Sequence, residues 1–420
     1  MTTSTSHEAA SRVGERPRVV LGVSGGIAAY KAAELLRRFT ESGHDVTVVP
    51  TASALEFVGA PTWAALSGKE IATGVFENIT EVPHVRLGQQ ADLVVVAPAT
   101  ANTLARAAHG IADDLLTNVL LTARCPVVFA PAMHTEMWEN AATQENVATL
   151  RRRGLHVIEP AVGRLTGADT GKGRLPDPAA VFEYCRSLLA RGTAEADLAG
   201  MHVVVSAGGT REPIDPVRFI GNRSSGKQGY ALASTAAARG ARVTLVAANT
   251  SLPDPAGVDV VRVSTTAELR GAVRAAAVDA DVVVMAAAVA DFRPAEAAES
   301  KIKKSDDSSA PEIRLVQNPH VLRELGHARV RAGQTVVGFA AETGDAHGTW
   351  LEHGRAKLAK YGVDLLIVNE VGVNLTFGAD HSAAVVIGAD GSEDPVPDGP
   401  KERLADVIWD RVLKLRSPTD

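Results

Sequence analysis

The sequence predicts an α/β protein made of two doubly wound, Rossmann-like domains with mainly parallel sheets. Short apolar runs of the kind that form buried parallel strands recur along the chain, as in Arg18–Val23 and Val203–Val205. Stretches with helical character separate these runs, which is the alternation typical of a doubly wound sheet. A length of 420 residues is sufficient for two domains or more.

In the first half, the order of the predicted elements is that of a βαβ unit continued by further strands. We expect a right-handed crossover between the first two strands, and ligands at the carboxyl ends of the strands. The predicted strands are Arg18–Val23, Asp45–Val49, Ala91–Ala97 and Val127–Ala130, and the predicted helices are Ala28–Thr40 and Pro178–Arg191.

The same alternation resumes in the second half and ends in an amphipathic helix. The predicted strands are Val203–Val205, Arg242–Ala247, Asp259–Val263, Asp281–Ala286 and Thr335–Phe339, and the helices are Gln228–Arg239, Thr266–Ala277 and Lys401–Leu415. Residues 390–400, rich in Pro, Gly and Asp, are predicted to form a loop. The predicted organisation is a disordered tail (1–16), a first domain (17–191), a linker (192–200) and a second domain (201–420).

Composition excludes several classes of function. A net charge of −6 and 4% aromatic residues argue against nucleic-acid binding, which needs basic patches and stacking rings. No apolar run is long enough for a membrane span, and the polar N-terminus lacks the hydrophobic core of a signal peptide. The two cysteines, Cys125 and Cys185, form neither a disulfide framework nor a metal-ligand pattern, and we expect both in the core. The predicted location is the cytoplasm.

The stretch Val203–Gly229 contains the strongest signal for anion binding. Small residues, hydroxyls and cations at Asn222–Lys227 precede a predicted helix, whose free N–H groups and dipole favour a phosphate. A P-loop is rejected, because Gln228 stands where a Ser or Thr would reach magnesium. A simple Gly/Ser turn is the alternative interpretation.

The first βαβ unit is predicted to bind a mononucleotide phosphate, as in a flavin, rather than a dinucleotide. The turn Ser24–Ile27 reads SGGI and does not fit G-x-G-x-x-G, and the second strand runs into Val49-Pro50-Thr51 without the acid that holds a ribose hydroxyl. Hydroxyl and amide side chains at Thr100, Asn102 and Thr103 follow the third strand and could donate to a phosphate.

The second half resembles the phosphopantothenate–cysteine ligases, which in many bacteria follow a flavin-dependent phosphopantothenoylcysteine decarboxylase in one chain. The motifs that carry this resemblance are AGGTREPIDPVRFIGNRSSGKQG, AAVADF, KIKK, QNPH and AKLAK. The resemblance implies Asn222 and Lys301 as catalytic residues and Asp291 as the magnesium ligand. It also implies contacts to substrate or nucleotide from Gly209, Arg218, Ser224, Ser225, Gly226, Lys227, Ala287, Ala288, Asp291, Pro319, His320, Phe339, Lys357 and Lys360. A lid after Lys301, over Ser305–Pro311, is expected to order on nucleotide binding.

The first half resembles the decarboxylases themselves, through SGGIAAYK, PHVRL, APATANTLA, PAM…MW and GKGRL in the family's order over about residues 18–180. This resemblance implies FMN as cofactor, His84 and His134 as catalytic residues, and a substrate contact from Met133. The implied FMN contacts are Ser24, Gly25, Gly26, Ile27, Thr51, Thr100, Asn102 and Thr103.

Three positions depart from the family patterns. His134 replaces an Asn that holds the substrate carboxylate, and His320 replaces an Asp of the ligase motif. Gly167 stands at the position of the family's proton-donating Cys, so Thr166, Asp169 or an ordered water would have to deliver the proton.

Together the resemblances imply a bifunctional enzyme of coenzyme A biosynthesis. It would join 4′-phosphopantothenate to L-cysteine with CTP and Mg²⁺ through an acyl-cytidylate, and then decarboxylate the product with FMN. Homo-oligomers are implied as well, with decarboxylase trimers or higher assemblies and ligase dimers. The first alternative is a ligase whose first half is an impaired scaffold. An NAD(P)-linked oxidoreductase and a pure flavin-binding module are the others.

Overall fold

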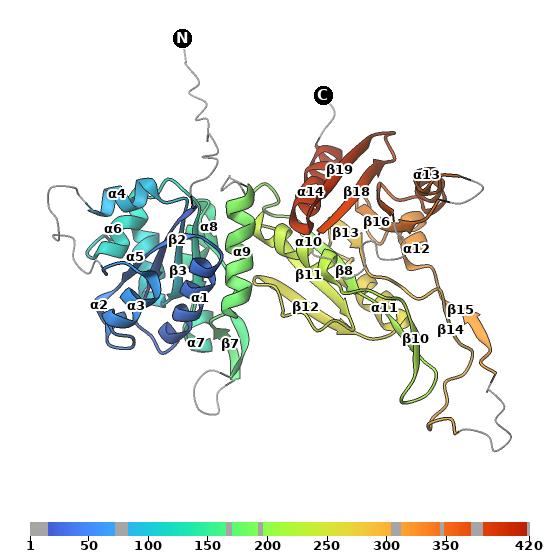
Figure 1. Cartoon of the computed structure of the whole chain (residues 1–420), viewed down its shortest axis with the longest axis horizontal. Helices are drawn as coiled ribbons and strands as arrows, with labels where there is room; N and C mark the ends of the chain where they lie inside the picture. The colour runs from blue at the N-terminus through green and yellow to red at the C-terminus, as the bar shows by residue number, and fades with distance from the viewer. Residues whose placement is uncertain are drawn as a thin grey trace, which may run out of the picture. The chain divides into compact units, whose positions relative to one another are not determined.

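The structure is a computed structural model that describes residues 16–71, 83–164, 170–191, 196–303, 312–344, 348–370 and 381–417. The chain divides into two compact units, Met1–Ala196 and Asp197–Asp420 (Figure 1). Each unit contains its own sheet with helices on both faces. The predicted fold class is therefore confirmed. The predicted tail and most of the predicted lid, Ser305–Pro311 included, lie outside the described residues.

Unit 1 contains a five-stranded parallel sheet with the order β2-β1-β3-β4-β5. This is the flavodoxin-like order, in which the strand order reverses between β1 and β3 and leaves a crevice at their carboxyl ends. The strands are β1 (Arg18–Val23), β2 (Asp45–Pro50), β3 (Leu93–Ala99), β4 (Val127–Pro131) and β5 (His156–Val157). A separate antiparallel hairpin is formed by β6 (Ala161–Arg164) and β7 (Thr170–Arg174).

Two layers of helices bury this sheet. On one face, Phe39 of α1 packs edge-on against Phe182 of α9, with their ring centroids 5.1 Å apart. The other face packs Leu104, Leu116 and Leu150 from three helices against the strands. The helices are α1 (Ala29–Glu41), α2 (Ala52–Leu55), α3 (Ala60–Ser67), α4 (Pro83–Gln90), α5 (Ala101–His109), α6 (Leu115–Thr122), α7 (Thr135–Glu139), α8 (Ala141–Arg152) and α9 (Pro178–Arg191).

Unit 2 contains an eight-stranded sheet with the order β12-β11-β8-β13-β16-β17-β18-β19. The first six strands are parallel, and in chain order they have the Rossmann arrangement 3-2-1-4-5-6. They are β8 (His202–Gly208), β11 (Arg242–Ala248), β12 (Val258–Val263), β13 (Val282–Met285), β16 (Thr335–Glu342) and β17 (Leu365–Glu370). The strand order reverses between β8 and β13, so a second crevice is expected there.

The far end of this sheet corrects one prediction. Residues 390–400 were predicted to be a loop, but β18 (His381–Gly388) and β19 (Glu393–Pro400) form an antiparallel hairpin that continues the sheet beyond β17. β19 is the edge strand, where Pro395 and Pro397 are tolerated because a missing N–H need not cost a ladder hydrogen bond.

Helices cover both faces of the sheet in unit 2. α10 and α14 pack against each other, and the buried Trp409 indole donates to the Leu232 carbonyl at 3.2 Å. Leu269, Leu325 and Leu358 pack in the core of the other face. The helices are α10 (Lys227–Ala238), α11 (Thr266–Ala276), α12 (Val321–His327), α13 (Trp350–Tyr361) and α14 (Lys401–Arg416). Two short antiparallel pairs lie outside the sheet (Figure 1): β9 (Arg211–Pro213) with β10 (Phe219–Gly221), and β14 (Phe292–Pro294) with β15 (Leu315–Gln317).

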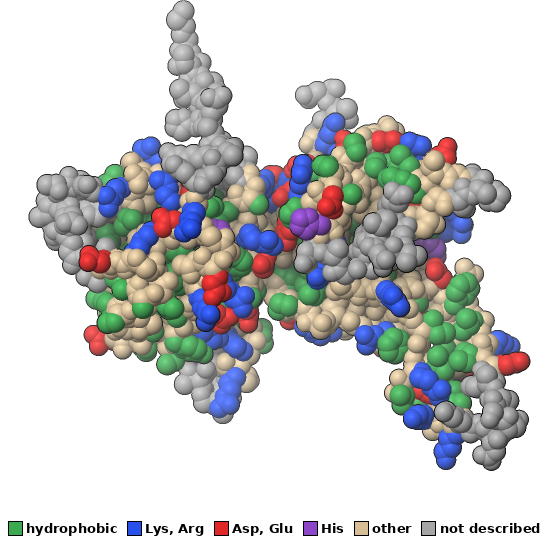
Figure 2. All heavy atoms as spheres, in the orientation of Figure 1, with side chains coloured by type: hydrophobic (Ala, Val, Ile, Leu, Met, Phe, Trp, Pro, Cys, Tyr) green, Lys and Arg blue, Asp and Glu red, His purple; other side chains and the backbone are tan. Residues whose placement is uncertain are grey.

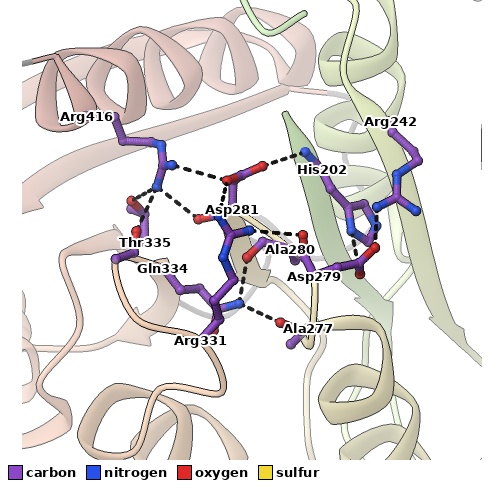
Figure 3. Close-up of polar contacts among 11 residues, drawn as sticks. His202, Arg242, Ala277, Asp279, Ala280, Asp281, Arg331, Gln334, Thr335 and Arg416 are labelled. Carbon is purple, nitrogen blue, oxygen red and sulfur yellow. Dashed lines mark hydrogen bonds and ion pairs between the residues drawn. The ribbon is translucent and has the colours of Figure 1, made fainter. Parts of the chain in front are cut away.

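A polar network closes the amino-terminal edge of the unit 2 sheet (Figure 3). The His202 ring lies 3.0 Å from the Asp279 carboxylate, and the His202 backbone N–H donates to Asp281 at 2.9 Å. Asp281 also pairs with Arg331 at 3.1 Å and with Arg416 of α14 at 3.3 Å. The network thus ties the start of β8 and the end of α14 to the residue before β13, and leaves the carboxyl edge for binding.

Candidate functional sites

The first candidate site is a cavity of about 890 Å³ at the carboxyl edge of the unit 1 sheet. It lies at the reversal between β1 and β3, where a doubly wound sheet is expected to bind a ligand. Of the residues predicted to serve flavin or substrate there, those that line the cavity are Gly25, Gly26, Ile27, Thr51, Thr100, Asn102, Thr103, Met133 and His134.

Three hydroxyls form a connected group at this edge. Buried Ser24 lies 2.8 Å from the Thr103 hydroxyl, which lies 3.1 Å from that of Thr100. Thr100 is also the N-cap of α5, since its side chain accepts from the Thr103 N–H. Asn102 accepts from Arg106 at 3.2 Å. The predicted set is thus assembled around one helix N-terminus, with Ser24 behind the cavity wall.

Gly25 is required at its position by close packing. A Cβ added there would lie 2.5 Å from the Cβ of Ser53 and 2.8 Å from its backbone carbon. The turn after β1 and the start of α2 could not come this close with any side chain at Gly25. A Cβ at Gly173 would lie 2.2 Å from the Met133 carbonyl, so β7 reaches the Pro131–His134 loop by the same means.

The cavity has a basic lining that was not predicted as part of the site. Lys31, Arg106, Arg164 and Arg174 all contribute to it, whereas Asp114 is its one lining carboxylate among the described residues. Burial, and then the nearby Arg174 charge, lower the pKa of Lys31. The GKGRL motif was a signal for Arg174, and Lys31 is the last residue of the SGGIAAYK motif, although neither was predicted to line the site. The cavity thus combines closely packed glycines, hydroxyls and cations. This combination suits a ligand that carries a phosphate, as FMN does.

His84 does not line this cavity. It is the second residue of α4, where its carbonyl accepts from the Thr122 hydroxyl at 2.9 Å. Its buried Nδ1 has no hydrogen-bond partner among the described residues. A buried polar atom without a partner is uncommon in folded proteins, and a group of this kind can acquire its partner on binding.

Neither cysteine is arranged as a proton donor. Burial raises the pKa of the Cys125 thiol to about 12, and fully buried Cys185 on α9 has its pKa raised by the same cause. Cys185 is a core residue, as predicted, whereas Cys125 is partly buried and packs against the core. Thr166, Gly167 and Asp169 lie outside the described residues.

We expect Gly25→Ala to weaken FMN binding by at least about tenfold, because one added methyl would separate the two turns that shape the cavity. Gly59→Ala is a matched control, since a Cβ there meets only the Cδ of Pro61, at 3.6 Å. Flavin fluorescence titration of both variants checks this. Equal affinities would show that the crowding at Gly25 is irrelevant to the flavin.

The second candidate site is a cavity of about 680 Å³ at the carboxyl edge of the unit 2 sheet. It is bordered by the loop before α10 and by the segments that follow β13, β15 and β16. The predicted residues that line it are Asn222, Ser224, Ser225, Gly226, Lys227, Ala287, Ala288, Asp291, Pro319, His320, Phe339 and Lys357. Gly209, Arg218, Lys301 and Lys360 were predicted for the same site and do not line the cavity.

Backbone pairing fixes the two loops at the reversal. The Ala288 N–H donates to the Gly208 carbonyl at 2.8 Å, and the Thr210 N–H donates to the Ala288 carbonyl at 3.2 Å. The Asn222 amide then donates to the Val289 carbonyl at 2.9 Å. Gly209 therefore supports the site from behind, where a Cβ would lie 2.7 Å from the Asn222 carbonyl.

The start of α10 is open toward the cavity. Gly226, at a positive φ of 78°, is its N-cap, and no side chain caps the helix. Ser224 and Ser225 instead accept from the Gly226 and Lys227 N–H groups, at 3.3 and 3.5 Å. An uncapped helix N-terminus beside a lysine is an arrangement that binds phosphate.

Lys357 brings a second cation into the cavity. Its ammonium pairs with Glu342, the last residue of β16, whose side chain is only 10% exposed. His320 packs against the Tyr361 ring with centroids 4.5 Å apart, and burial lowers its pKa. The lining thus includes several cations, with Asp291 as its one carboxylate among the described residues.

Asp291 lies in the segment that follows β13, and this segment forms part of the cavity wall. Its backbone carbonyl accepts from the Asn318 N–H at 2.8 Å, and its exposed side chain lines the cavity. In the described part of the chain, no group of three or more His, Cys, Asp or Glu side chains could hold a metal ion. One carboxylate fits Mg²⁺ that arrives with nucleotide phosphates, because Mg²⁺ commonly takes one or two protein carboxylates and keeps its waters.

Several lining residues were not predicted, since no local motif marks them. Asn369, Ser382 and Lys401 come from β17, β18 and α14, and Gln228 donates to the Lys401 carbonyl at 3.3 Å. These residues meet only because the antiparallel hairpin continues the sheet. Across the described residues, no helix has the length and apolar character needed to cross a membrane.

Known families match both halves of the chain. A model described as "DNA/pantothenate metabolism flavoprotein C-terminal domain" matches residues 198–415, and one described as "Flavoprotein" matches residues 7–190. The chain is 59% identical to the "Coenzyme A biosynthesis bifunctional protein CoaBC" of Mycolicibacterium smegmatis over 413 residues, which cover 96% of this chain and 99% of that protein. Its identity to the protein of that name from Mycobacterium tuberculosis is 58% over 402 residues, covering 94% and 96%. Its identity to the protein of that name from Vibrio vulnificus is 43% over 358 residues, which cover 85% of this chain and 87% of that protein.

Proposed function

The chain belongs to the family of bifunctional coenzyme A biosynthesis proteins, and from this membership we propose how its two cavities divide the work. The chain is a ligase and a decarboxylase. The ligase reaction is assigned to the unit 2 cavity and the decarboxylase reaction to the unit 1 cavity. The observation that carries this proposal is that the strand order of each sheet reverses at one point, and that most of the residues predicted for one activity line the cavity at that point.

In unit 2, the substrates are 4′-phosphopantothenate, L-cysteine and CTP. A carboxylate acylates an amine poorly, so it first attacks the α-phosphate of CTP to give an acyl-cytidylate and pyrophosphate, and the cysteine amine then displaces CMP. The α10 N-terminus, Lys227 and Lys357 neutralise the phosphates, and Asp291 holds Mg²⁺. Asn222 orients the acyl-cytidylate, and Lys301 approaches the phosphates of CTP. No protein nucleophile is required.

In unit 1, the chain binds FMN at the crowded turn that contains Gly25 and through the hydroxyls of Thr100 and Thr103, with Ser24 hydrogen-bonded to Thr103 from behind the cavity wall. Bound FMN would supply the oxidation of the substrate thiol that makes loss of CO2 possible, and the later return of those electrons. His134 donates a hydrogen bond to the substrate carboxylate at the mouth of the cavity, and His84 moves a proton.

Association of copies completes the proposal. His84 does not line the flavin cavity of its own unit, so the cavity of a neighbouring copy would receive it. In unit 2, the pair of β14 and β15 exposes Phe292 and Leu315, at 52% and 46%, and the nearby Ile313, at 40%. Figure 2 shows hydrophobic and basic side chains together on this part of the chain. Exposed apolar side chains grouped in this way suit contact with a second copy.

A single incubation tests the function. Purified protein is mixed with 4′-phosphopantothenate, L-cysteine, CTP and Mg²⁺, and the products are followed by mass. We expect 4′-phosphopantetheine, CMP and pyrophosphate, and less product when ATP replaces CTP. Accumulation of phosphopantothenoylcysteine would indicate a ligase with an inactive first unit. No product from either reaction would contradict the proposal.

A further inference from the structure

The turn between β9 and β10 holds the backbone of the segment that contains Lys301. Asp215 in this turn is buried, and its carboxylate accepts from the Val217 and Arg218 N–H groups, both at 2.8 Å. The same carboxylate accepts from the N–H of Ile302 at 3.2 Å, although Ile302 lies 87 residues away in the sequence. The turn therefore provides a fixed acceptor for a distant segment.

Arg218 completes the attachment. Its guanidinium donates twice to the Asp215 carboxylate, at 2.9 and 2.5 Å, and its Nη2 also donates to the Ile302 carbonyl at 2.8 Å. The guanidinium beside Asp215 holds the pKa of that carboxyl well below its usual range, so the pair stays charged at neutral pH. Both backbone polar groups of Ile302 are thus bound by one ion pair, and the Ala298 N–H donates to the Ile214 carbonyl at 2.9 Å.

This arrangement changes the role expected for Arg218. Sequence resemblance implied a substrate contact, but Arg218 does not line the unit 2 cavity, and its guanidinium already binds Asp215 and Ile302. We propose that Asp215 and Arg218 are positioning residues, which fix Ile302 so that the adjacent Lys301 is presented to the nucleotide phosphates. This inference rests on the role proposed above for Lys301.

The physical advantage lies in preorganisation. Lys301 is exposed, and a lysine on an unfixed segment would lose backbone freedom each time it met a phosphate. Fixing the next residue at both its N–H and its C=O removes much of that loss before the nucleotide arrives. The hydrogen bonds are charge-assisted, so they are stronger than bonds between neutral groups.

The test uses Asp215→Asn and Arg218→Gln in the full chain and has two readouts. The first is the initial rate of trypsin cleavage after Lys301 and Lys303 without nucleotide, measured by mass well below the melting temperature. We expect cleavage to be about tenfold faster in both variants, because the segment must open locally to enter the protease. Arg218→Lys, which keeps the charge but not the planar fork, should be intermediate.

Asp364→Asn is the matched control for both readouts. Asp364 likewise accepts two bonds from an arginine, Arg329, at 2.9 Å each, and one from a backbone N–H, that of Val336, at 2.7 Å. It does not line the cavity. The control should lower the melting temperature but leave cleavage after Lys301 unchanged.

The second readout is ligase kinetics. We expect Asp215→Asn to raise the KM for CTP about tenfold, and to add little to the effect of Lys301→Ala in the double variant, because both act through the same lysine. Unchanged cleavage would overturn the attachment itself. Faster cleavage with an unchanged KM for CTP would show that the attachment does not position Lys301. Additive effects of Asp215→Asn and Lys301→Ala would show the same. If the wild-type chain made no phosphopantothenoylcysteine, the proposed function would fail, while the cleavage rates would still test the attachment.

Discussion

Replacement of His84 by Asn should abolish most decarboxylation while the ligase reaction and flavin binding continue. We expect the rate of CO2 release to fall about 10³-fold, within the range of a lost proton-transfer group. The histidine is not part of the flavin cavity wall, and its side chain makes no hydrogen bond from Nδ1 within the described residues. Its removal should therefore leave the flavin bound. Phosphopantothenoylcysteine should accumulate in the coupled incubation.

His109→Asn is a suitable control, because His109 is exposed in the last turn of α5. It should decarboxylate like the wild type. Equal loss in the two variants would mean that any histidine change perturbs unit 1, and unchanged CO2 release from His84→Asn would remove His84 from the mechanism.

The position of His84 also makes a complementation experiment possible. A chain with His84→Asn retains an intact flavin cavity, and a chain with Gly25→Ala retains an intact His84. If the histidine serves a neighbouring copy, refolding the two together should raise decarboxylation above the summed rates of the separate variants, at an FMN concentration too low to saturate Gly25→Ala. Failure to restore activity, in mixtures shown to co-assemble, would place His84 and the flavin of one copy in the same site.

Strands and the edges that bind ligands could be predicted from the sequence, because buried parallel strands are continuous apolar runs and ligands bind at the carboxyl ends of such strands. Residues 93–99 and 203–208 illustrate this, since nearly all are apolar or small and each run is buried along its whole length. The motifs that follow such strands were identifiable because loop residues at the carboxyl edge are close in sequence to the strands that position them.

Other features depend on contacts that sequence does not reveal. The β19 edge strand contains Pro395 and Pro397, which read locally as a loop, and its pairing with β18 decides otherwise. Lys401 was assigned only to the start of a helix, and it reaches the cavity because that hairpin carries it there. Arg218 was assigned from a motif, but its two partners include Ile302, far along the chain. The role of a residue whose partners are distant in sequence can therefore be recognised only from the structure.

Asn222→Asp should separate the two half-reactions of the ligase. The Asn222 amide donates to the Val289 carbonyl at 2.9 Å, and a carboxylate cannot donate there. Two acceptors would then face each other, so the loop would lose the orientation in which we propose that it holds the acyl-cytidylate. The triphosphate contacts proposed for Lys227 and Lys357 are untouched. We therefore expect acyl-cytidylate to form and its reaction with cysteine to slow about 10²-fold, the scale of one lost transition-state contact.

A single-turnover incubation followed by mass measures this directly, since acyl-cytidylate and phosphopantothenoylcysteine differ in mass. Asn249→Asp is the matched control: its amide donates at 2.9 Å to the carbonyls of Gly209 and Ser264, yet the side chain does not line the cavity. The control should lower stability without accumulation of the intermediate. Normal phosphopantothenoylcysteine production by Asn222→Asp would contradict the assignment. Accumulation in both variants would trace the effect to the loop after β8, because Asn249 donates to the Gly209 carbonyl and the Asn222 carbonyl lies close against Gly209.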